Sequence, residues 1–129
     1  MKIELTLDNA YTNKYCMEAQ AEEINGADIL DYFSTDQLEE LMGIWTKSLK
    51  SGGKIILGGT DIFMLAKNVL NRSKELVDIN KVLFRRPNTI KSVTSIESTK
   101  DFLVSMGFDI VNIEFDFNTC LYCVEAYKV

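Results

Sequence analysis

The most constraining feature of the sequence is a run of three aliphatic residues at 55–57. It comes shortly after a segment with a helical pattern and a pair of glycines. Over residues 38–49, apolar side chains recur at spacings of three and four, which predicts an amphipathic helix. We expect this helix to end at Gly52 and Gly53, with Gly53 in a left-handed turn, because glycine adopts that conformation at little cost. A strand that is apolar on both faces is typical of the centre of a sheet covered by helices. The segment therefore predicts an α/β protein with a central strand at 54–57.

The rest of the chain alternates between strand and helix patterns. Strands are predicted at 2–7, 22–27, 108–117 and 121–127, and further helices at 62–71 and 95–106. Ser34 or Thr35, Asp61 and Ser95 are suited to cap the three helices. We therefore expect a single domain over residues 1–129, a three-layer α/β fold whose mostly parallel sheet has an antiparallel last strand.

The acidic balance of charge narrows the partners that the protein can have. The formal net charge is −5, and nucleic-acid binding depends on clustered Lys and Arg. We therefore do not expect nucleic acid as the main partner. The chain starts directly with a strand pattern, and no apolar run reaches the ~20 residues that span a membrane. A cytoplasmic protein without a membrane segment is expected.

Histidine is absent from the sequence, which removes the usual general base near neutral pH and the commonest transition-metal ligand. Cys120 and Cys123 have the spacing of a CxxC pair, but residues three apart on a strand point to opposite faces. No second pair completes a zinc site. We expect free thiols in a reducing compartment. The sequence predicts no metal site and identifies no catalytic residue.

The turn at residues 49–53, Leu-Lys-Ser-Gly-Gly, resembles one part of the class I S-adenosylmethionine-dependent methyltransferases. There a helix ends in an LKPGG-like turn before the fifth strand, and serine replaces the usual proline here. The resemblance covers roughly residues 18–129 and includes the final helix, which ends in Gly107-Phe108 before two antiparallel strands. It implies the later half of a Rossmann-like methyltransferase fold, with S-adenosylmethionine as the cofactor. It also implies a substrate loop at residues 72–95.

The glycine-rich cofactor loop of that family, D/E-x-G-x-G-x-G, is missing, and no GxG occurs in the chain. The acidic residue that holds the ribose hydroxyls in the family is missing with it. Whether the protein is an enzyme therefore stays open, and methyl transfer is the reaction expected if it is one. The alternatives are a non-catalytic binding or assembly module on the same fold, and a small enzyme of other chemistry.

The resemblance places the floor of the cofactor pocket at the end of the strand predicted at 22–27. The candidate cofactor-binding residues are Asn25, Gly26, Ala27 and Asp28. The alternative is a tight turn that needs glycine. Asp31 and Tyr32 stand where relatives carry an acidic residue and histidine, and they are candidates for an acid and a hydrogen-bond donor to the substrate.

Two further groups of residues are candidates for substrate binding. Small residues after the central strand leave room for a ligand, and a helix N-terminus favours an anion. A phosphate or carboxylate suits a pair of arginines. The candidates are Gly58, Gly59, Thr60, Asp61, Arg85 and Arg86. The alternatives are a plain strand-to-helix turn capped by Asp61, and a solvated basic turn.

Compared with the sheet of a full-length methyltransferase, the predicted sheet lacks strands on its N-terminal side. The strand at 22–26 therefore lies near an edge of the sheet, and only the strand at 2–7 is available to cover it. Sheet edges tend to be paired or covered, and leftover apolar area marks interfaces. We therefore expect a homodimer, with a small-molecule ligand near the junction.

Overall fold

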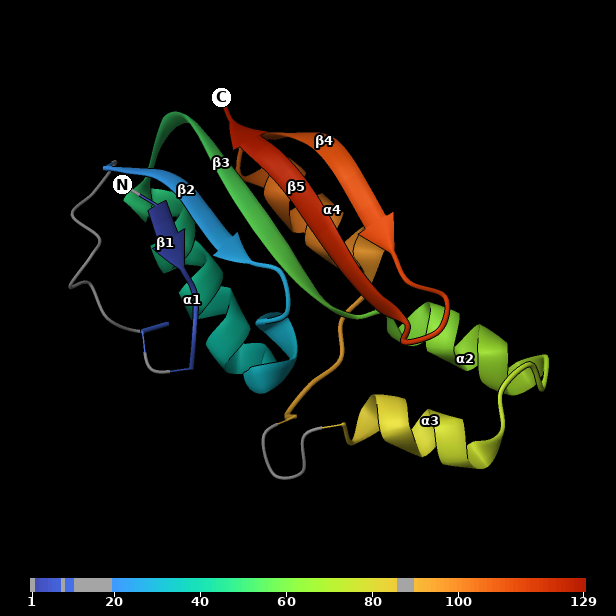
Figure 1. The fold of residues 1–129 in the computed structure, drawn as a ribbon. Helices are drawn as coiled ribbons and strands as arrows, with labels where there is room; N and C mark the ends of the chain where they lie inside the picture. The colour runs from blue at the N-terminus through green and yellow to red at the C-terminus, as the bar shows by residue number, and fades with distance from the viewer. Residues whose placement is uncertain (1, 8, 11–19, 86–89) are drawn as a thin grey trace.

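The computed structural model describes residues 2–7, 9–10, 20–85 and 90–129. One mixed sheet organises them, with its strands in the order β1-β2-β3-β5-β4 (Figure 1). The strands are β1 (Lys2–Glu4), β2 (Ala21–Gly26), β3 (Leu49–Thr60), β4 (Phe108–Phe115) and β5 (Leu121–Lys128). The helices are the 3-10 turn η2 (Leu30–Tyr32), α1 (Thr35–Ser48), α2 (Ile62–Leu70), α3 (Leu76–Leu83) and α4 (Ile96–Ser105).

Strand directions confirm the expected sheet. β1, β2 and β3 pair in parallel, and β5 is antiparallel to β3 on one side and to β4 on the other. Four strands thus run one way and only β5, the last in the chain, runs the other. β1 covers the edge of β2 within the chain, as the alternating pattern at residues 2–7 allowed. None of the described helices is long and apolar enough to cross a membrane.

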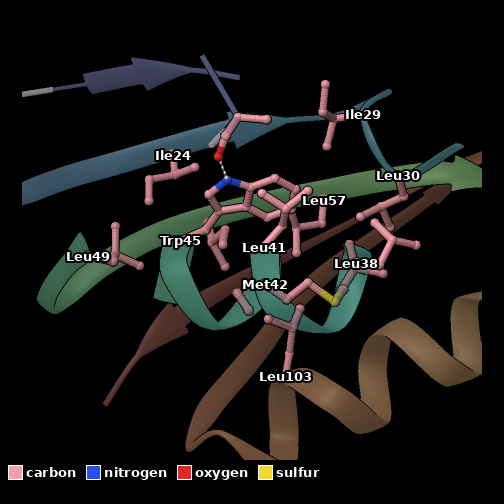
Figure 2. Packing of buried hydrophobic residues seen from close by; sticks show 14 of the residues in the cluster. Ile24, Ile29, Leu30, Leu38, Leu41, Met42, Trp45, Leu49, Leu57 and Leu103 are labelled. Atoms are coloured by element: carbon pink, nitrogen blue, oxygen red, sulfur yellow. Dashed lines mark hydrogen bonds between the residues drawn. The ribbon is translucent and has the colours of Figure 1, made fainter. Parts of the chain in front are cut away.

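The core lies between one face of the sheet and two helices. Leu41 and Trp45 of α1 are buried against the strands, and the Trp45 indole N–H donates to the Ala10 carbonyl at 3.1 Å (Figure 2). Leu103 of α4 belongs to the same cluster, together with Ile24 of β2. Both helices therefore cover the same face.

The opposite face of the sheet is polar. Lys54 of β3 lies between Glu23 and Glu125, with Nζ–O distances of 3.1 and 3.3 Å. This face suits water because three neighbouring strands present paired charges to it. The α/β, Rossmann-like class is confirmed, and the described residues supply two of the three expected layers.

Three helix starts follow the sequence prediction. Ser34 and Gln37 form a capping box at α1, and Ser95 and Ser98 form another at α4. The Asp61 side chain accepts from the Met64 N–H at the start of α2. Each cap satisfies backbone N–H groups that have no partner within the helix.

The end of α1 differs from the prediction. The helix stops at Ser48, and Leu49 is already extended as the first residue of β3. The Lys128 ammonium takes the place of a glycine cap, because Nζ donates to the carbonyls of Thr46 (2.8 Å) and Leu49 (2.7 Å). A cation there also suits the negative end of the helix dipole.

Residues 72–95 contain α3, which packs on α2 outside the two layers (Figure 1). The helix α2, predicted at 62–71, has an apolar face that is largely uncovered: Leu65 is buried, while Phe63 and Leu70 are 69% and 82% exposed. The reason is that α2 meets no sheet face. It shares a small cluster with Val82 of α3 and Cys120.

Two glycine substitutions, one within α1 and one near the start of β3, test the backbone observed there. Gly52, and not Gly53 as predicted, has the positive φ (79°), and a methyl group there would meet nothing within 4 Å. Gly52→Ala should therefore destabilise the protein by about 1–2 kcal/mol through the backbone alone. Gly43→Ala, inside α1 and equally free of contacts, should stabilise it by about 0.5–1 kcal/mol. Urea denaturation measures both, and effects of the same sign would contradict the assigned turn.

Candidate functional site

A buried carboxylate marks the point where the carboxyl ends of β2 and β3 meet. Asp31, in η2, is fully buried. It accepts from the Thr60 N–H at 3.0 and 3.1 Å and from the Thr60 hydroxyl at 2.6 Å. The Arg85 guanidinium donates to the same carboxylate at 2.9 Å. Asp31 is therefore held by hydrogen bonds and by an opposite charge, as a buried ion must be.

Arg85 joins this carboxylate to a second one. Its Nη2 also donates to Asp28 at 2.8 Å, and its Nη1 donates to the Thr60 hydroxyl at 3.0 Å. The Tyr32 hydroxyl in turn donates to Asp28 at 3.3 Å. The Nε of Arg85 is buried and has no acceptor among the described residues. Arg86, the other predicted arginine, lies outside the described residues.

The glycines after β3's apolar run leave room for the protein rather than for a ligand. A Cβ at Gly59 would lie 2.6 Å from the Asp31 carboxylate, and a Cβ at Gly58 would collide with the carbonyls of Tyr122 and Ala27. Asp61 is buried and accepts from Met64 and from the Ile96 N–H. Gly58 and Gly59 thus allow close packing, and Asp61 caps α2, as the alternative of a plain strand-to-helix turn predicts; the ligand-binding roles of these residues stay predictions.

A cavity of about 410 Å³ lies at the carboxyl ends of β1 and β2. Its lining combines acidic, amide, hydroxyl and aliphatic side chains: Glu4, Leu5, Thr6, Leu7, Asn25, Ala27, Asp28, Ile29 and Tyr32. The volume is within the range of small-molecule sites. Ligands of open α/β sheets bind at this end of the strands.

Three of the four predicted cofactor residues line this cavity: Asn25, Ala27 and Asp28. Gly26 does not, and a Cβ there would press on Ile29 and Leu5 at 2.7 and 2.9 Å. Sequence reasoning missed Glu4, which accepts from the Asn25 amide at 3.4 Å, and Thr6. The available signal was the polar set of positions within the alternating strand predicted at 2–7, to which both residues belong.

The described residues carry no cluster of His, Cys, Asp and Glu suited to a metal ion. Both described cysteines are free, and burial raises the pKa of each thiol. Burial also raises the pKa of Tyr122 to about 12, while its hydroxyl bonds to Thr94 and Thr99. The two thiols and the phenol are therefore protonated at neutral pH, and none of the three lines the cavity at the ends of β1 and β2.

Removing one carboxylate at a time tests the buried ion pair. Asp31→Asn keeps the shape but leaves Arg85 with an incomplete partner set, so the free energy of unfolding should fall by about 3–5 kcal/mol. Asp28→Asn, at a half-exposed position, should cost under about 1 kcal/mol. Equal losses in urea denaturation would contradict a structural role specific to Asp31.

The sequence matches no family profile and no curated protein. Solved structures share its fold. A SAM-dependent methyltransferase from Archaeoglobus fulgidus superposes with a TM-score of 0.63 at 14% identity, over 89% of this chain and 62% of that one. Magnesium protoporphyrin IX methyltransferase (ChlM) from Synechocystis PCC 6803, with bound SAH, gives 0.60 at 11% identity, over 88% and 47%.

An S-adenosylmethionine-dependent methyltransferase from Mesorhizobium loti gives a TM-score of 0.59 at 12% identity, over 88% of this chain and 64% of that one. The chain thus spans less than two thirds of the length of each of these three proteins. Its sheet and helices match only part of theirs. The chain has a partial S-adenosylmethionine-dependent methyltransferase-like fold.

Proposed function

We propose that this protein binds S-adenosylmethionine in the cavity at the carboxyl ends of β1 and β2, as a methyltransferase or a direct derivative of one. The observation that carries the proposal is the acidic lining of that cavity, where Glu4 and Asp28 stand beside aliphatic residues and Asn25. S-adenosylmethionine has a sulfonium and an ammonium group, which carboxylates complement. The methyltransferase-like fold supports the same ligand.

Methyl transfer suits a site without histidine. The reaction is an in-line displacement at a sulfonium, so orientation of the two reactants supplies much of the rate. The hydroxyl of Tyr32 and the amide of Asn25 are the polar groups that would orient the ligand at this cavity. The methyl acceptor stays unassigned.

Calorimetric titration of a monomeric sample tests the proposal. The chain lacks a glycine-rich loop, which in the family holds the amino-acid end of the cofactor, so we expect weak binding, with a Kd above 100 μM or about 5.5 kcal/mol of binding free energy at most. S-adenosylmethionine should bind more tightly than S-adenosylhomocysteine, because only the first carries the sulfonium charge. If binding does not saturate at millimolar ligand, S-adenosylmethionine is not the cofactor. If the Kd is micromolar, the prediction that binding is weak is wrong.

A matched pair of variants locates the ligand. Glu4→Gln removes one carboxylate from the cavity and should reduce the preference for S-adenosylmethionine over S-adenosylhomocysteine several-fold. Glu39→Gln makes the same charge change on the exposed surface of α1 and should leave both affinities unchanged. Equal effects of the two variants would show that net charge, and not the cavity, sets the preference.

A second candidate function is a non-catalytic assembly module that forms a homodimer. The supporting observation is the exposure of large apolar side chains on α2 and around α3, where Leu70 is 82%, Leu76 74% and Phe84 63% exposed. Exposed apolar side chains of this number commonly mark an interface, and a two-fold dimer is the commonest way to bury them.

Light scattering tests the dimer. The native chain should give twice the 14.7 kDa monomer mass at micromolar concentration. Leu70→Glu with Phe84→Glu should give the monomer, because a buried interface would have to accept two charges. Val104→Glu, at an exposed site on α4, should leave the dimer intact. A concentration-independent monomer mass for the native chain would reject the assembly.

A further inference from the structure

A second cavity, of about 460 Å³, lies between α3 and the turn that joins β4 to β5. Its lining is rich in cationic and neutral polar side chains: Lys74, Asp78, Lys81, Val82, Arg85, Asn118 and Thr119. Three of these residues are cations and one is an acid. Because Asp28 and Asp31 pair with Arg85, the positive charge open to a ligand at this concave surface is that of Lys74 and Lys81, with Asp78 as the one acid of the lining.

The cationic groups keep hydrogen-bond donors available for a ligand. The Lys74 ammonium donates to the Asn118 carbonyl at 2.8 Å, and an ammonium has three donors in all. Arg85 lines the cavity with a guanidinium whose Nε is buried and finds no acceptor among the described residues. The Nη1 and Nη2 atoms of Arg85 are already engaged by Thr60, Asp28 and Asp31, so the donors open to a ligand are those of the two lysines.

The fold fixes these groups relative to one another. Lys81 and Arg85 are four residues apart, on the last turn of α3 and directly after it, and Lys74 precedes the helix. The Asn118 carbonyl ties Lys74 to the β4–β5 turn. Arg85 is held in turn by Asp28 and Asp31 at 2.8 and 2.9 Å. Lys74 and Arg85 are therefore each tied to the body of the protein, on opposite sides of α3 in sequence.

We propose that this cavity binds a small organic oxyanion, a phosphate monoester or a carboxylate, with Lys74 and Lys81 as the binding side chains and Arg85 in the cavity wall. Ammonium groups that line one cavity favour oxyanions, because each supplies a positive charge and up to three hydrogen-bond donors. Val82 gives the cavity an apolar wall, which favours an organic body over a bare inorganic ion. The proposal does not depend on S-adenosylmethionine, since none of these three residues lines the first cavity.

An ¹H–¹⁵N NMR titration tests the site with phenyl phosphate, inorganic phosphate and benzoate, each at an ionic strength held constant with sodium chloride. We expect saturable shifts of the amide signals of Lys81, Asn118 and Thr119. Phenyl phosphate should bind at least tenfold more tightly than inorganic phosphate. Saturation by phenyl phosphate alone assigns a phosphate ester, saturation by benzoate alone assigns a carboxylate, and saturation by both supports the wider class.

Two double variants distinguish binding in this cavity from attraction to the overall charge of the protein. Lys74→Gln with Lys81→Gln should weaken the tightest of the probes at least tenfold. Lys47→Gln with Lys100→Gln changes the net charge equally, at two residues that do not line the cavity, and should change the affinity less than twofold. The Lys74 and Lys81 side chains are not buried, so the folded state survives their replacement, which the amide spectrum verifies. No saturable shift with any probe, or equal weakening by the two double variants, overturns the proposal.

Discussion

The Asp31 carboxylate is the group on which the arrangement of the sheet's carboxyl ends depends. It accepts from Thr60 at the end of β3 and from Arg85 after α3, while its own backbone carbonyl accepts from Lys91 and Ser92. Segments 29 to 61 residues away in sequence thus meet at Asp31. A carboxyl group is tolerated in this fully buried position because each oxygen has hydrogen-bond donors and a guanidinium lies beside it.

This arrangement separates structural groups from ligand-binding groups. The Asp31 carboxylate accepts its hydrogen bonds from groups of the protein itself. Gly59 has no side chain that would fill the space beside this carboxylate. Asp28 and Arg85, the other members of the network, each line a different cavity. One ion pair of 2.8 Å therefore forms part of the wall between two chemically different surfaces, one with carboxylates and one with cations.

Local patterns in the sequence were enough to predict much of the fold. Strand periodicity located all five strands, and the capping residues Ser34, Asp61 and Ser95 set the helix starts correctly. Such signals succeed because the interacting groups lie within four residues of each other. The end of α1 was predicted wrongly because its cap is Lys128, which is 79 residues from Leu49. No local pattern can indicate a partner at that separation.

For the candidate site too, the sequence predicted positions that follow from topology but not those that depend on contacts between distant segments. Asn25, Ala27 and Asp28 were placed at a strand end by a rule of topology, and they line a cavity there; their role in binding stays a prediction. The close packing at Gly58 and Gly59 could not be predicted, because an absent side chain does not reveal which atoms fill the space. The exposure of α2 also escaped prediction, since periodicity gives a helix an apolar face without showing what covers it. That Lys74 and Lys81 line one cavity with Arg85 could not be predicted, because only the fold brings them together.

The position of β5 also has a consequence for biosynthesis. This strand comes last in the chain yet lies between β3 and β4. While the ribosome is still adding residues 121–128, the nascent polypeptide has both flanking strands but nothing to join them, and the hydrogen-bonding edge of β3 is open. Final closure of the sheet must wait for release of that segment from the exit tunnel. Open strand edges of this kind are where incomplete chains aggregate, so early translation stops should yield insoluble products rather than folded shorter forms.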